Sequence, residues 1–239
     1  MDYRNNDPGA VQYGNFVNYY KFNNAGQRLK LLPRDVWNDV ENTPSTTEPY
    51  LVLDVGCNAG NLTQLLYTFL NDCVGIPNGR DIQILGVDID AELVKRAKDS
   101  NEFPSNVSYD NLDIMDANAL NRIKEYLFKR NRKRFDVVSS FSITMWIHLN
   151  HEDEGLRQFL TKLCDLAKLL VIEPQPWKCY QTAVRRMKRA GDEFPLFVTL
   201  EWRSNVEECI QNFLEIELVR KKIFECAPTR WQRRICFYR

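Results

Sequence analysis

The residues best suited to ligand binding follow two apolar runs in the first half of the chain. The first run ends at Asp54 and is followed by Gly56 and Gly60; glycine lets a backbone turn sharply and approach a ligand closely. The second run ends at Asp88, whose carboxylate can accept two hydrogen bonds from sugar hydroxyls. The glycine spacing is not that of the G-x-G-x-x-G loop of a pyrophosphate site. The pattern therefore predicts a nucleoside pocket without a pyrophosphate cradle; the alternative is a purely structural turn.

The order acid-x-Gly-x-x-x-Gly from Asp54 to Gly60 resembles the first motif of class I S-adenosylmethionine-dependent methyltransferases. The resemblance implies S-adenosylmethionine as the cofactor, S-adenosylhomocysteine as the product, and Asp88 as the partner of the ribose. Asp113 and Ile114 follow a third apolar run. They are expected at the adenine amino group and ring, or else in a surface turn.

Strands and helices must alternate to bring these residues to one edge of a sheet. Apolar runs predict strands at 50–55, 82–87, 107–112, 135–141 and 169–172. Helical spacing of apolar residues predicts helices at 62–70, 91–99, 117–130, 152–167 and 180–190. This alternation is typical of βαβ units, with a parallel sheet covered on both faces.

The two ends of the chain depart from this alternation. A short helix is expected at 29–40, and two alternating runs, 215–225 and 234–238, predict a terminal hairpin. We therefore predict an α/β fold of the Rossmann-like, class I methyltransferase type, with a mostly parallel sheet ending in an antiparallel hairpin. Residues 1–30 are expected to form an N-terminal arm that closes over the active site, and residues 31–239 a single methyltransferase domain.

The net charge of zero conceals two halves of opposite sign. Residues 1–120 carry 9 basic and 17 acidic side chains, and residues 121–239 carry 23 and 15. The basic excess includes two tracts without acids, 178–189 and 228–239. Such tracts indicate a surface for a polyanion, although a solvated helix face and a basic terminus have the same composition.

Composition also restricts the cellular setting. No apolar run approaches the ~20 residues of a membrane span. The 7 cysteines are scattered without a C-x-x-C pair, which predicts neither a disulfide framework nor a metal site and favours a reducing intracellular compartment. The cytoplasm is the expected location, and the nucleus remains open as a second one.

Two segments after the fourth and fifth predicted strands carry the candidate substrate residues. Both histidines of the chain, His148 and His151, lie near Trp146 and Asn150. A helix cap accounts for the asparagine, but not for the histidines and the tryptophan. The second segment, 173–180, is stiffened by two prolines and leads into the first basic tract. We expect both segments to face the substrate.

These segments resemble the bicoid-interacting family of RNA-end methyltransferases. The matching motifs are Tyr13-Gly14-Asn15, Leu53–Asn58, Trp146–Asn150 and Glu173–Trp177, within residues 10–239. The resemblance implies methyl transfer to the 5′-terminal monophosphate of small RNAs, with histidine transfer RNA and microRNA precursors as substrates of the nearest branch. No metal and no membrane are implied, and a monomer is expected.

The resemblance also indicates which residues form the site. Arg28 and Asn58 are expected to hold the cofactor carboxylate. The expected cofactor residues are Arg28, Asp54, Gly56, Asn58, Gly60, Asp88, Ile89, Asp113, Ile114 and Phe141. The expected catalytic residues are His148, Asn150 and Tyr19. The expected RNA-binding residues are Tyr20, His151, Gln175, Lys178, Arg185, Arg186, Arg189 and Arg233.

The chemistry of a 5′-monophosphate suits moderate hydrogen-bond donors. Its second pKa lies near ~6, so at neutral pH the phosphate is an anionic nucleophile that needs no general base. The protein must align the reactants and exclude water, a role that His148, Asn150, Gln175 and a tyrosine could share. The basic tracts would hold the RNA backbone.

Three alternatives remain open. One is the γ-phosphate methyl-capping enzyme of small nuclear RNA, a branch that typically has a lysine where this chain has Met145. Another is a small-molecule methyltransferase, which would leave the basic tracts without a role. The last is an RNA-binding protein without turnover, which the intact Asp54–Gly60 loop and Asp88 disfavour.

Overall fold

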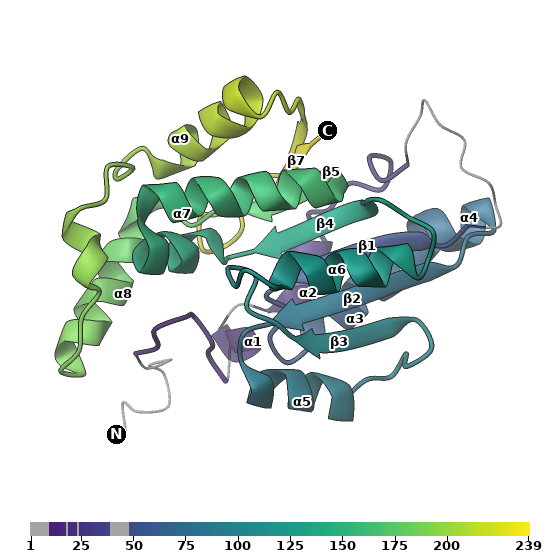
Figure 1. The fold of residues 1–239 in the computed structure, drawn as a ribbon, viewed down its shortest axis with the longest axis horizontal. Helices are drawn as coiled ribbons and strands as arrows, with labels where there is room; N and C mark the ends of the chain where they lie inside the picture. The colour runs from purple at the N-terminus through teal and green to yellow at the C-terminus, as the bar shows by residue number, and fades with distance from the viewer. Residues whose placement is uncertain (1–9, 18, 23, 39–47) are drawn as a thin grey trace.

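The computed structural model describes residues 10–17, 19–22, 24–38 and 48–239 (Figure 1). In this part of the chain seven strands form one sheet, in the order β3-β2-β1-β4-β5-β7-β6. Strands β1 to β5 run parallel, whereas β7 pairs antiparallel with both β5 and β6. The predicted α/β fold with an antiparallel end is therefore confirmed. The strands are β1 Tyr50–Val55, β2 Ile82–Asp88, β3 Val107–Asn111, β4 Phe135–Phe141, β5 Ala167–Glu173, β6 Lys222–Glu225 and β7 Cys236–Tyr238.

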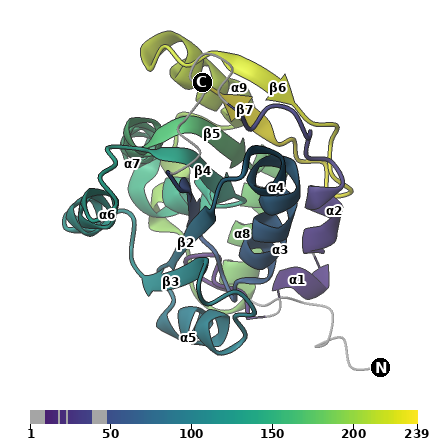
Figure 2. The same ribbon diagram turned by 90° about the vertical axis from the view of Figure 1, so that its right-hand side faces the viewer.

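The central strands divide their side chains between two helical layers. In β1, Leu51, Leu53 and Val55 join one buried cluster, while Tyr50 and Val52 join the other, as the two-residue period of a strand requires. Figure 2 shows the two layers on opposite sides of the sheet. The first cluster includes residues of α6 Ala119–Phe128, α7 Thr144–Leu166, α8 Trp177–Arg189 and α9 Val206–Asn212; the second includes residues of α2 Ala25–Leu29, α3 Asn61–Leu70 and α5 Ala91–Asp99.

Short elements complete the described chain. They are α1 Tyr19–Phe22, α4 Ile76–Asn78, a 3-10 helix at Pro195–Val198, and π-helices at Asn71–Gly75 and Phe213–Glu217. Within the described ranges, no helix combines the length and apolar character that a membrane crossing needs.

The helix expected at 29–40 is wrong for its described residues. Helix α2 ends at Leu29, and turns follow as far as residue 38; residues 39 and 40 lie outside the described chain. Pro33 has no amide hydrogen for a helix, and its carbonyl accepts a hydrogen bond from Trp37 Nε1 at 2.6 Å. The irregular segment instead buries Trp37 against Phe237 of β7.

The strand expected at 215–225 is also wrong in its first part. Leu214 is fully buried and Ile216 is 73 % exposed, although a strand would place both on one face. The chain is helical over Phe213–Glu217, where Phe213 and Leu214 are buried, and β6 begins only at Lys222.

The helix expected at 152–167 begins earlier. Helix α7 starts at Thr144, and a non-helical backbone at Glu152 (φ 57°, ψ −172°) divides it into two parts. Its first part carries the segment of the two histidines along the carboxyl end of β4. Helix α9 was not predicted.

Candidate active site

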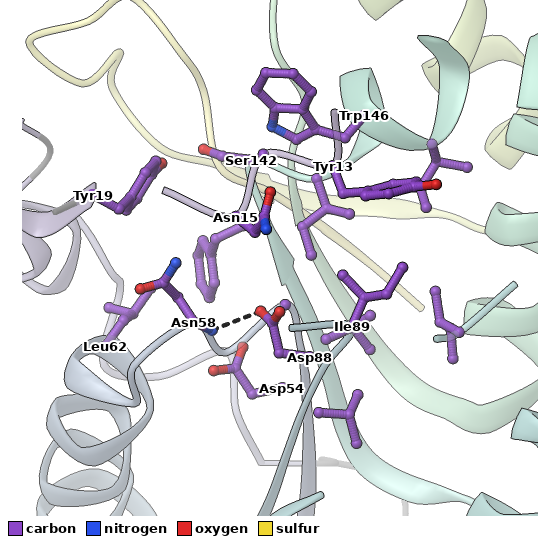
Figure 3. Close-up of a pocket in the computed structure, with 18 of the residues that line it drawn as sticks. Tyr13, Asn15, Tyr19, Asp54, Asn58, Leu62, Asp88, Ile89, Ser142 and Trp146 are labelled. Carbon is purple, nitrogen blue, oxygen red and sulfur yellow. Dashed lines mark hydrogen bonds between the residues drawn. The ribbon is translucent and has the colours of Figure 1, made fainter. Parts of the chain in front are cut away.

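A cavity opens where the loops after β1, β2 and β4 meet the N-terminal segment (Figure 3). We call it the first cavity. It lies at the carboxyl ends of parallel strands, the edge at which open α/β sheets bind ligands. The expected cofactor residues that line it are Arg28, Asp54, Gly56, Asn58, Asp88, Ile89, Asp113, Ile114 and Phe141.

The two glycines of the loop after β1 have different neighbours. Gly56 (φ 80°) lines the cavity, and a Cβ on it would lie 1.9 Å from Ile143 Cδ1. Gly60 (φ 80°) does not line the cavity; a Cβ there would lie 2.6 Å from the Tyr109 hydroxyl. Gly60 therefore allows the turn into α3 to pack on β3, and the structure does not bring it to the cavity where a cofactor contact was expected.

Two carboxylates of the first cavity are held by hydrogen bonds. Asp88 Oδ2 accepts from the Asn58 amide at 2.9 Å (Figure 3), and Asp54 accepts from the hydroxyls of Thr63 and Ser139 at 2.7 and 2.8 Å. Burial raises the pKa of both carboxyls. A carboxylate offers about four lone-pair sites, so Asp88 can still accept from sugar hydroxyls.

The N-terminal segment is fastened across the first cavity from two sides. Asn15 Nδ2 donates to Asp90 Oδ2 at 2.7 Å, beside the end of β2. Asn58 Nδ2, in the loop after β1, donates to the Phe16 carbonyl at 3.1 Å. These bonds explain why the expected arm residues Tyr19 and Tyr20 line the cavity.

Arg28 of α2 is wholly buried in the cavity wall. Its Nε and Nη2 contact the Glu173 carboxylate at 2.6–3.2 Å, and Nη2 also donates to the hydroxyls of Tyr19 and Ser142 at 2.8 and 2.9 Å. Among the described residues, Arg28 Nη1 has no hydrogen-bond partner. An unpaired buried donor is costly, so this atom is suited to an anionic group of a ligand.

These features fit S-adenosylmethionine. Arg28 Nη1 would hold its carboxylate, Asp88 its ribose hydroxyls, and the side chains of Ile89, Ile114 and Phe141 would enclose its nucleoside. The expected role of Asp113 at the adenine remains a prediction; its Oδ1 accepts from the Met115 amide at 2.8 Å.

A second cavity adjoins the first. Tyr19, Ser142 and Trp146 line both. The two cavities differ in their charged side chains. The first has three carboxylates, Asp54, Asp88 and Asp113, beside Arg28, whereas the described lining of the second has no acidic residue. The second cavity has four basic residues, Lys178, Arg186, Arg230 and Arg233. It is therefore suited to an anion.

His148 does not reach either cavity. It is fully buried, with Nδ1 3.1 Å from the Tyr180 hydroxyl and Nε2 3.1 Å from Asp153 Oδ1. A neutral ring that donates from Nε2 and accepts at Nδ1 satisfies both neighbours. This placement argues against the catalytic role expected for His148 and makes it a link between α7 and α8.

Asn150 and Gln175 are also occupied by the protein. Asn150 exchanges two hydrogen bonds with Gln12 and lines neither cavity, contrary to its expected catalytic role. Gln175 lines the second cavity, but its Oε1 accepts from Thr144 and Met145 and its Nε2 donates to the Ser142 carbonyl. Its amide therefore fixes the loop after β4.

The other expected RNA-binding residues fall into three groups. Lys178, Arg186 and Arg233 line the second cavity, and Tyr20 and His151 line the first. Arg185 and Arg189 are exposed on α8 and line neither cavity.

Sequence reasoning missed Ser142 and Glu173 as site residues. Ser142 has a positive φ of 62°, and its hydroxyl donates to Glu173, which also binds Arg28. For Glu173, the sequence did contain a signal: an acidic residue at the end of an apolar strand, directly before a proline. Across the described residues, no group of three or more His, Cys, Asp and Glu side chains is placed to hold a metal ion.

Solved structures of methyltransferases share this fold. The N-methyltransferase NodS from Bradyrhizobium japonicum superimposes with a TM-score of 0.52 and 14% identity, over 93% of this chain and 97% of NodS. The bifunctional kinase-methyltransferase WbdD gives a TM-score of 0.56 and 16% identity, over 98% of this chain and 44% of WbdD. Together with the sheet order, these likenesses define the fold as that of a class I methyltransferase.

Sequence relatives specify the family. The family model described as Bicoid-interacting protein 3 (Bin3) matches residues 135–239. The pre-miRNA 5′-monophosphate methyltransferase of Xenopus laevis is 41% identical over 98% of this chain and 94% of the relative. The RNA 5′-monophosphate methyltransferase of Homo sapiens is 36% identical over 97% of this chain and 82% of the relative. The chain therefore belongs to the Bin3 family of methyltransferases.

A more distant relative represents the capping branch. The 7SK snRNA methylphosphate capping enzyme of Mus musculus is 25% identical over 71% of this chain and 32% of the relative. The sequence is therefore more similar to the monophosphate methyltransferases.

Proposed function

We propose that this protein transfers a methyl group from S-adenosylmethionine to the 5′-monophosphate of small RNAs, histidine transfer RNA and microRNA precursors among them. The observation that carries the proposal is the meeting of two cavities at Tyr19, Ser142 and Trp146. One cavity is suited to a nucleoside with a carboxylate. The other is lined by basic residues and is suited to a phosphate.

The residues present suit a reaction that depends on alignment. Bound S-adenosylmethionine supplies an electrophilic methyl group. A 5′-monophosphate is already an anionic nucleophile at neutral pH, so the lack of acidic residues in the described lining of the second cavity is compatible with the chemistry. Tyr19 and Trp146 would exclude water where the cavities meet, and the basic side chains would orient the phosphate.

Helix α8 supports RNA over a small molecule as the substrate. Lys178, Arg185, Arg186, Lys188 and Arg189 lie on this helix, which contains no acid. Lys178 and Arg186 line the second cavity, while Arg185 and Arg189 are exposed beyond it. An RNA backbone that extends from the second cavity along α8 would contact these basic residues. The affinity of the protein for RNA would then depend strongly on salt.

The test is transfer of labelled methyl groups to one hairpin RNA with a 5′-monophosphate, a 5′-triphosphate or a 5′-hydroxyl. We expect label on the monophosphate alone, and loss of this activity in Asp88→Ala. Asp116→Ala is the matched control, because Asp116 is an exposed turn carboxylate outside both cavities. Label on the triphosphate would favour the capping reaction, and label on none would contradict the proposal.

A further inference from the structure

Two arginines converge on one hydroxyl at the boundary between the cavities. Arg28 Nη2, from the first cavity, donates to Ser142 Oγ at 2.9 Å, and Arg233 Nη1, from the second, donates to the same oxygen at 2.6 Å. The Ser142 hydroxyl donates to Glu173. A left-handed backbone at Ser142 (φ 62°), which non-glycine residues adopt at a cost, places this hydroxyl between the two guanidinium groups.

The two arginines share a single carboxylate unequally. Glu173 forms an ion pair with Arg28 at 2.6 Å. Among the described residues, no carboxylate lies within ion-pair distance of Arg233; its Nη2 contacts only the Cys179 thiol, at 3.7 Å, and its buried Nε has no partner. A thiol is a weak acceptor. Of the two guanidinium groups, that of Arg28 is therefore paired directly with a carboxylate, whereas that of Arg233 has no such pairing among the described residues.

The backbone of Arg233 is fixed. Its amide donates to Thr229 Oγ1 at 3.0 Å, and its carbonyl accepts from the Thr229 amide at 2.8 Å. Thr229 itself is buried. Arg233 is thus held both at its backbone and at Nη1, and a group held in this way loses little freedom when it binds a ligand.

We propose that Arg233 is the residue that recognises the 5′-phosphate, and that Ser142 is a positioning residue that orients Arg233 and Arg28 together. This inference rests on the proposed function. Lys178 is exposed, so its charge is weakened by solvent. Arg186 and Arg233 are both half-buried, but Arg233 also has a buried Nε that lacks a hydrogen-bond partner among the described residues. A charged hydrogen bond from a guanidinium is among the strongest available to a phosphate. Arg233 would distinguish phosphorylated from unphosphorylated RNA ends, whereas the basic residues of α8 would bind the backbone of either RNA equally well.

The experiment measures binding of one hairpin RNA, with either a 5′-monophosphate or a 5′-hydroxyl, to the protein saturated with S-adenosylhomocysteine. The wild type is expected to prefer the phosphorylated end. Arg233→Ala is expected to reduce this preference about 10- to 100-fold, the size of a lost charged hydrogen bond, and to leave S-adenosylhomocysteine affinity unchanged.

Arg234→Ala is the matched control. Arg234 is the next residue in the chain, and its side chain is 56% exposed and pairs with Glu225. Its loss is therefore expected to lower the affinity for both RNAs equally. Arg233→Lys, which keeps the charge but not the planar fork, replaces Arg233→Ala if that variant does not fold, and is expected to lose about tenfold in preference.

Ser142→Gly tests the positioning role, because glycine accepts the positive φ and lacks the hydroxyl. It is expected to lower both the preference for the phosphate and the affinity for S-adenosylhomocysteine, whereas Arg233→Ala lowers only the former. A purely structural role would change neither selectively.

The outcomes separate the two proposals. A wild type that binds both RNA ends equally would refute the proposed function itself. A wild type that prefers the phosphate, with Arg233 variants that retain this preference, would leave the function standing and overturn the assignment of Arg233.

Discussion

Gln12 and Asn150 are joined by two hydrogen bonds although 138 residues separate them. Gln12 Nε2 donates to Asn150 Oδ1 at 2.6 Å, and Asn150 Nδ2 donates to the Gln12 carbonyl at 2.9 Å. Asn150 lies in the first part of α7, so this pair fastens the N-terminal segment to the helix beside both cavities. Its contribution to function is therefore expected to pass through the segment that covers the first cavity.

Asn150→Ala is accordingly expected to lower the affinity for S-adenosylhomocysteine about 3- to 30-fold, the effect of one or two neutral hydrogen bonds. Titration calorimetry measures this affinity. Gln12→Ala should have a similar effect, and the double variant should add little to either single change. Loss of turnover with unchanged cofactor affinity would instead support the catalytic role expected from the sequence.

Gly14 is expected to be irreplaceable where the N-terminal segment crosses Trp146. It has a φ of 73°, and a Cβ would lie 2.2 Å from Trp146 Nε1. Gly14→Ala should displace the segment and lower the affinity for S-adenosylhomocysteine at least tenfold. Gly191→Ala is the control, since Gly191 has a φ of 85° with open space around it; it should cost only about 1–2 kcal/mol of stability. Equal effects of both variants on affinity would contradict this reasoning.

Asp88 is expected to determine affinity for the nucleoside. Asp88→Asn retains the shape but places an amide against one of the backbone donors that bind the carboxylate. The affinity for S-adenosylhomocysteine should fall about 10- to 100-fold, as measured by calorimetry, while Asp116→Asn should change it little. An unaltered affinity in Asp88→Asn would exclude Asp88 from the cofactor site.

His148 is expected to make stability depend on pH. Burial lowers its pKa below the usual value, although the neighbouring Asp153 opposes this shift and Arg157 adds to it. As the pH falls below about 6.5, the unfolded chain takes up the proton first, so the free energy of unfolding should decrease. In His148→Gln this decrease should be smaller.

Urea unfolding of the wild type and His148→Gln between about pH 7.5 and about pH 5.5 measures how the free energy of unfolding changes with pH in each protein. The contributions of other titrating groups cancel when the two changes are subtracted. Parallel pH profiles of the wild type and His148→Gln would show that His148 is not the group responsible.

Much of the central sheet could be predicted because each element there carries its own signal. The strand at 135–141 and the helix at 91–99 were predicted with the bounds that the structure has. Both have an apolar pattern of a single period, and the helix also begins with an aspartate cap. Residues 215–217 were wrongly assigned to a strand because alternating Glu, Ile and Leu side chains suit one. Burial of the neighbouring Phe213 and Leu214 against other elements decides for a helical turn.

The features of the site also fall into those that the sequence predicts and those that only the tertiary structure decides. The sequence determined the parallel α/β order, the glycine loop and the acid at the end of β2, because these depend on residues close together in the chain. Tertiary structure decided which polar side chains reach a ligand. His148 and Asn150 have suitable chemistry in a suitable segment, yet both are bound by groups distant in sequence or buried by other elements. Ser142 and Arg233, 91 residues apart, meet only because β7 returns beside β5, and hydrogen bonds between distant strands leave no local pattern in a sequence.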